Sequence, residues 1–93
     1  MNNIFSNNKC CKRRLKASLT RFIGGILRYE LNEITACDRK CYVITVATER
    51  ERRSCCFGCN KTDALRIYRT IVDSTVTPCT LSDIAADFLL SRE

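Results

Sequence analysis

The chain has 93 residues and a formal charge of +6, and it contains eight cysteines and no histidine. This length supports one hydrophobic core, so we expect a single small domain. The missing histidine removes the commonest general base, and three glycines are too few for a phosphate-binding loop or a dinucleotide fingerprint. We therefore predict a protein that is not an enzyme.

The positive charge is concentrated at the start of the chain. Residues 1–28 hold seven basic and no acidic side chains, whereas the remainder is close to neutral. We predict that residues 1–26 form a basic, partly disordered arm and that residues 27–91 form a single α+β domain. The candidate binding residues of this arm are its basic side chains: Lys9, Lys12, Arg13, Arg14, Lys16 and Arg21.

Apolar residues in the second half of the arm recur at spacings of three and four. Leu15, Leu19, Phe22 and Ile23 follow this period, with basic residues between them, and Gly24 marks an end. The period is typical of an amphipathic helix, which we expect over about residues 12–23. Such a helix would pack against the domain, bind nucleic acid or lie on a membrane surface.

Three strands are expected after the arm. Residues 27–34 alternate apolar and polar side chains, and residues 41–48 are rich in β-branched and aromatic types. Polar residues 35–40 between them read as a hairpin connection, and residues 49–52 as the turn before a third strand at 53–57. The pattern predicts a three-stranded antiparallel meander.

Two helices are expected to follow the meander. Asn60 is a favourable N-cap with Asp63 three residues later, and an apolar stripe then runs through about residue 74. This first helix would cover the sheet. Thr80 and Asp83 read as the capping box of a short C-terminal helix that follows Pro78.

The C-terminal third resembles a known family. The run Val76-Thr77-Pro78-Cys79-Thr80-Leu81-Ser82-Asp83-Ile84-Ala85-Ala86-Asp87-Phe88-Leu89 looks like the closing motif of short uncharacterised clostridial-type (Firmicutes) proteins, a domain of unknown function. Residues 29–33 and 41–44 are similar to that family's first two strands. The resemblance covers about residues 28–90, and it implies the α+β fold and a Gram-positive cytoplasmic setting without implying an activity.

Four cysteines are spaced as two short pairs, Cys37-x3-Cys41 and Cys56-x2-Cys59, each near a predicted turn. Four thiolates brought together could hold zinc tetrahedrally. The alternatives are small half-buried thiols and a disulfide or redox pair. No segment reads as a secretion signal or a membrane span, so we expect a cytoplasmic protein with mostly reduced thiols.

Two classes of function fit these features. The first is a protein-interaction module that presents an unpaired strand, or the acidic residues Asp83 and Asp87, to a protein partner or to a second copy. The second is a small nucleic-acid-binding or regulatory protein that uses the basic arm. A membrane-surface helix and a small zinc-binding domain are further alternatives.

Overall fold

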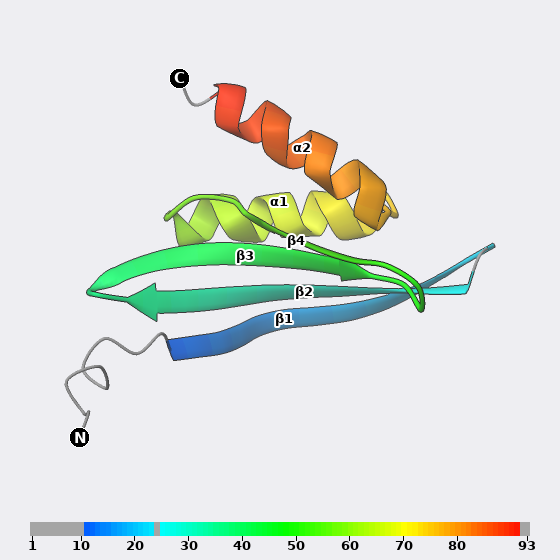
Figure 1. The fold of residues 1–93 in the computed structure, drawn as a ribbon, viewed down its shortest axis with the longest axis horizontal. Coiled ribbons are helices and arrows are strands. Elements are labelled where there is room, and N and C mark those ends of the chain that lie inside the picture. Colours follow the sequence, from blue (N-terminus) through cyan, green and yellow to red (C-terminus); the bar gives the residue numbers. More distant parts are fainter. Residues whose placement is uncertain (1–10, 24, 92–93) are drawn as a thin grey trace.

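The computed structural model describes residues 11–23 and 25–91, with side chains described as far as residue 88. It contains one antiparallel sheet in the order β1-β2-β3-β4, and both helices lie on the same face of that sheet (Figure 1). The predicted α+β class is thus confirmed. The elements are β1 (Cys11–Phe22), β2 (Gly25–Ala36), β3 (Arg39–Ala47), β4 (Arg52–Cys56), α1 (Lys61–Asp73) and α2 (Pro78–Ser91).

The sheet has one strand more than predicted, because the expected helix at residues 12–23 is wrong. This segment is β1, which pairs antiparallel with β2 from Cys11↔Thr35 to Phe22↔Gly25. Its side chains alternate in direction, but polar Ser18 faces the helices and apolar Leu19 faces away, so the apolar pattern of this segment does not identify the strand. A short isolated helix is marginal in water, whereas a long neighbouring strand offers a full ladder of hydrogen bonds. Residues 1–10 of the predicted arm, including Lys9, lie outside the described residues, whereas the arm from Cys11 onward is ordered as β1.

The turns fix the register of the meander. Cys37 and Asp38 form the two-residue turn between β2 and β3, with φ values of 51° and 67°. Positive φ at both central residues is the requirement of a type I′ hairpin, so the predicted connection at 35–40 is confirmed in a tighter form. The next turn is held by the Thr48 hydroxyl, which accepts hydrogen bonds from the backbone N–H groups of Arg50 and Glu51 at 3.2 and 3.0 Å.

The starts of the two helices differ in how well the sequence predicts them. The Asn60 side chain accepts a hydrogen bond from the Asp63 N–H at 2.9 Å, as expected for the N-cap of α1. The predicted capping box at Thr80 is wrong, because α2 already begins at Pro78 and Thr80 lies in its first turn. Proline at the first helical position is favoured, since its missing N–H would have no partner there.

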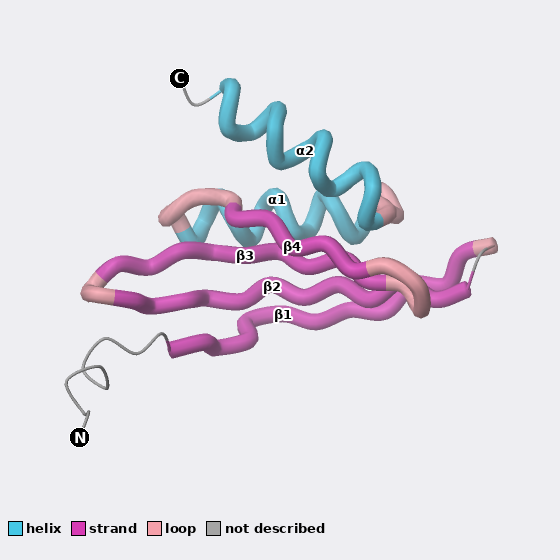
Figure 2. Tube along the Cα trace, in the orientation of Figure 1, coloured by secondary structure: helices cyan, strands magenta, loops and turns pink. Residues whose placement is uncertain are grey.

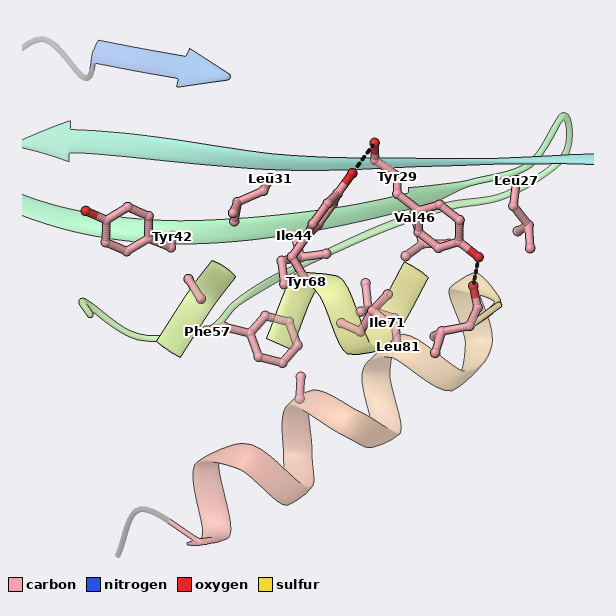
Figure 3. Close-up of a cluster of buried hydrophobic side chains, with 13 residues drawn as sticks. Leu27, Tyr29, Leu31, Tyr42, Ile44, Val46, Phe57, Tyr68, Ile71 and Leu81 are labelled. Carbon is pink, nitrogen blue, oxygen red and sulfur yellow. Dashed lines mark hydrogen bonds between the residues drawn. The ribbon is translucent and has the colours of Figure 1, made fainter. Parts of the chain in front are cut away.

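The core lies between the sheet and the helices (Figure 3). Alternate residues of β2 and β3 point into it, and α1 and α2 cover them. Two tyrosine hydroxyls in this core donate hydrogen bonds that link the sheet to the helical layer. Tyr29 donates to the Val76 carbonyl at 3.0 Å, and Tyr68 donates to the Ser18 hydroxyl at 3.0 Å. The residues that β2, β3 and α1 bury most completely include Leu27, Tyr29, Leu31, Ile44, Val46, Ala64 and Ile71.

Candidate functional site

Within residues 11–23 and 25–91, no helix or loop packs against the face of the sheet turned away from the helices, and we call it the open face. Because successive strand residues point to opposite sides, the paired registers assign every second residue of β2, β3 and β4 to it, and alternate residues of β1 on either side of a register shift between Arg14 and Lys16. One row across all four strands is Leu19, Arg28, Ala47 and Arg52, and the next is Ala17, Glu30, Thr45 and Ser54. An antiparallel sheet tolerates one solvated face, so its exposure alone carries no functional meaning.

The chemistry of the open face is distinctive, because it is strongly basic. Six exposed basic residues lie on it, and they come from all four strands: Lys12, Arg14, Arg21, Arg28, Arg39 and Arg52. Among the described strand residues of this face, Glu30 is the single acid, and its carboxylate lies 3.5 Å from the Arg14 guanidinium. The net charge of the open face is therefore +5.

The helical layer on the other side has a different balance. The described residues of α1 and α2 carry three basic side chains (Lys61, Arg66, Arg69) and four acidic ones (Asp63, Asp73, Asp83, Asp87). The predicted interaction residues Asp83 and Asp87 are both exposed on α2. The molecule is consequently polarised, with a basic sheet face and a slightly acidic helical layer.

Small polar side chains occupy the centre of the open face. Thr45 is buried among its neighbours and its hydroxyl lies 2.7 Å from that of Ser54. The Asn32 amide, also buried, donates to Glu30 at 3.4 Å. These side chains are shorter than the arginines on the same face. The positively charged groups therefore surround a shallow area made of shorter side chains.

The predicted arm residues are divided between the two faces. Lys12, Arg14 and Arg21 belong to the open face, whereas Arg13 and Lys16 belong to the face that the helices cover. Arg13 lies 3.6 Å from the buried Glu33 carboxylate. Its side chain is still 67% exposed, so this ion pair lies at the surface of the covered face.

Glu33 is the one buried acid on the covered face among the described residues. The Tyr42 hydroxyl donates to it at 2.9 Å, and Lys40 lies 3.9 Å away. The hydrogen bond from Tyr42, and then the positive charges of Lys40 and Arg13, lower the pKa of Glu33, while burial opposes them. Burial and the hydrogen bond to Glu33 raise the pKa of Tyr42. This cluster fixes the end of the sheet near the β2–β3 turn.

The four cysteines predicted as zinc ligands are not gathered into one site. Cys41 and Cys56 form a disulfide that joins β3 to β4, with their Cα atoms 6.7 Å apart. Cys37, at the β2–β3 turn, and Cys59, beyond β4, are exposed free thiols. Across residues 11–23 and 25–91 no three histidine, cysteine or acidic residues lie together as metal ligands. The expectation of reduced thiols does not hold for the Cys41–Cys56 pair.

Sequence reasoning misses an exposed apolar group at the end of the β1–β2 hairpin. Leu19 is 69% exposed, Ile26 is 37% exposed, and Ile23 in the turn is fully exposed. The helical period places these residues on the apolar side of a helix instead. The two glycines at 24 and 25 are the signal that could have indicated a hairpin turn between two alternating strands.

Comparison of the chain with protein-family models, with curated proteins and with solved structures gave no significant match. The resemblance to clostridial-type proteins therefore stays a prediction. What the fold defines is a small α+β protein with one basic sheet face that the described helices leave open. In the described part of the chain, no helix is both long enough and apolar enough to cross a membrane.

Proposed function

We propose that the protein binds double-stranded nucleic acid through the open face, without sequence specificity and without catalysis. The observation that supports this proposal is the placement of six basic residues and one acid on a single solvated face. Lysine and arginine side chains that contact phosphates release condensed counterions, and this release drives sequence-independent binding. A surface with a net charge of +5 suits a polyanion better than a neutral protein surface.

The positions of the aromatic residues favour a duplex over a single strand. Phe22, Tyr29 and Tyr42 all lie on the covered face, where they contribute to the core or pack against it. Proteins that bind single strands stack unpaired bases on exposed aromatic rings. The described strands offer no such ring on the open face, so the backbone phosphates of a duplex are the better target.

A salt titration with the full-length protein tests this proposal. Fluorescence anisotropy with a labelled DNA duplex of about 20 base pairs should show binding whose logarithm falls linearly with the logarithm of salt concentration. A single strand of the same length should bind more weakly at each salt concentration. Binding that is absent at low salt, or that does not respond to salt, would contradict the proposal.

A protein-interaction function is the second candidate, and the free edge of β1 favours it. β1 is an outer strand of twelve residues, and among the described strands only β2 pairs with it. An extended segment could add to this edge as a further strand. Five basic residues and no acid lie on β1, so an acidic segment fits better than a second copy of β1.

Light scattering coupled to size-exclusion chromatography separates these two forms of interaction. A dimer that persists at high salt would support self-association through a strand edge, whereas a contact made by the carboxylates of Asp83 and Asp87 should weaken as the salt concentration rises. A monomer at high concentration leaves only a different protein as partner. Neither result depends on nucleic acid, so the second candidate is tested independently of the first.

A further inference from the structure

The β1–β2 hairpin extends beyond the part of the sheet that the helices cover (Figure 1, Figure 2). It also reaches past the turn between β3 and β4. On the covered side of the sheet, Phe22 at the end of β1 still packs against the core. On the open face, no described element lies over the end of the hairpin. The apolar residues noted above, Leu19, Ile23 and Ile26, lie at this end. Exposed aliphatic side chains gathered in one place usually mark a contact surface.

The apolar residues of the hairpin end alternate with arginines. Leu19 pairs directly with Arg28, and Arg21 pairs directly with Ile26. All four residues lie on the open face, so two aliphatic and two cationic side chains form a small diagonal pattern there. Ile23 projects from the turn beyond them. This pattern continues the basic open face, and it adds apolar groups that phosphate binding alone does not require.

We propose that the hairpin end enters a groove of a DNA duplex and places an aliphatic side chain, Ile23 or Leu19, against a base step. This inference rests on the proposed function. Proteins that bend DNA insert apolar residues such as isoleucine and leucine between base steps, which partly unstacks and kinks the duplex. Arg21 and Arg28 would contact the phosphates on either side and hold the inserted residue in place.

The shape of the element favours DNA over duplex RNA. A two-stranded ribbon fits a groove of B-form DNA, whereas the major groove of A-form RNA is too deep and narrow for side chains to read. Pyrimidine–purine steps such as TA unstack most easily. The hairpin end should therefore deform sequences that contain TA steps more than sequences that lack them.

The test measures deformation separately from affinity. A DNA duplex carries a fluorescent donor and acceptor at its two ends, and a second duplex carries 2-aminopurine at a central TA step. The full-length protein is compared with Leu19→Ser/Ile23→Ser, which removes the apolar groups and keeps every charge. Arg39→Gln/Arg52→Gln serves as the contrasting variant, because it removes charge from β3 and β4 of the open face and keeps both aliphatic residues and both hairpin arginines. Both altered pairs are exposed, so unchanged thermal melting is the check on folding.

At saturating protein, the wild type should increase energy transfer between the duplex ends and raise the 2-aminopurine fluorescence. The Leu19→Ser/Ile23→Ser protein should bind with similar salt dependence but lose most of both signals. The charge variant should bind more weakly and, once saturated, still give both signals. A wild type that binds DNA without changing either signal would overturn the inference and leave the proposed function standing.

Two further results would also overturn it. If no duplex binds at all, the proposed function fails together with this inference. A third arm uses vesicles of phosphatidylcholine with phosphatidylserine, because an apolar group beside arginines would also suit an anionic membrane surface. Vesicle binding that Leu19→Ser/Ile23→Ser abolishes, with no DNA deformation by the wild type, would assign the hairpin end to lipid instead.

Discussion

The two faces of the sheet are built by the same strands but carry opposite chemistry. On the covered face, β2 and β3 present aliphatic and aromatic side chains that are almost fully buried, and the acid there, Glu33, is held by Tyr42 and nearby cations. On the open face, exposed arginines from all four strands stand among small polar and aliphatic side chains. A period of two thus places the residues that build the core and the residues of the proposed binding face within the same strands.

This separation has an energetic consequence. Removing a buried aliphatic side chain loses its transfer free energy and leaves a cavity, whereas an exposed arginine contributes little to folding. Substitutions on the covered face should therefore change stability, and substitutions on the open face should change binding. The expected effects range from a large loss of stability to a change in pH dependence.

The largest effect is expected for Ile44→Ala, at a fully buried position in the middle of β3. It should lower the free energy of unfolding by about 2 to 5 kcal/mol, measured by urea denaturation. The matched control is Val43→Ala, because Val43 is the next residue and lies on the open face, where it is half-exposed. Equal losses for the two variants would contradict the division between the faces.

A smaller loss is expected for Tyr29→Phe. This change removes the hydroxyl that donates to the Val76 carbonyl and leaves the ring in place. The Val76 carbonyl then loses this hydrogen bond, so the free energy of unfolding should fall by roughly 1 kcal/mol. Urea denaturation measures this change in the free energy of unfolding. An unchanged midpoint would mean that this hydrogen bond does not help to join β2 to the segment before α2.

Glu33 should make stability depend on pH in the acidic range. Its folded pKa lies below the ordinary value of 4.5, so its stabilisation is fully present above that value and is lost as the pH falls through the folded pKa. Thermal melting of the wild type should therefore decline more steeply below about pH 4.5 than melting of Glu33→Gln. Parallel declines in the two proteins would contradict the assignment.

The sequence predicts the covered face well and the open face poorly. The alternation of Leu27, Tyr29 and Leu31 and the N-cap at Asn60 identify β2 and α1 correctly, because both signals are local and the core reinforces them. The first strand escapes prediction because its apolar residues fit a helical period, whereas the strand turns polar Ser18 toward the helices and apolar Leu19 toward the open face. Pairing with β2, which is not local, decides in favour of the strand.

The candidate site escapes prediction for the same reason. The basic residues 12–21 stand out as a group in the sequence, but Arg28, Arg39 and Arg52 join them only through the register of β2, β3 and β4. Truncation of the chain is a poor way to test the role of the basic residues. A protein that starts at Arg28 would lack β1 altogether, so side-chain substitutions are a cleaner probe of the basic charge than truncation.

The most direct test of the account compares equal reductions of charge on the two sides of the molecule. Arg28→Gln/Arg52→Gln removes two charges from the open face, and Lys61→Gln/Arg69→Gln removes two exposed charges from α1. Anisotropy measures duplex binding by each protein across a range of salt concentrations. The open-face variant should bind more weakly, and the slope of log affinity against log salt should become shallower by about 0.9 for each phosphate that the protein no longer neutralises. The α1 variant should keep the wild-type slope, and both should melt like the wild type. Equal weakening of binding in the two variants would contradict the assignment of binding to the open face.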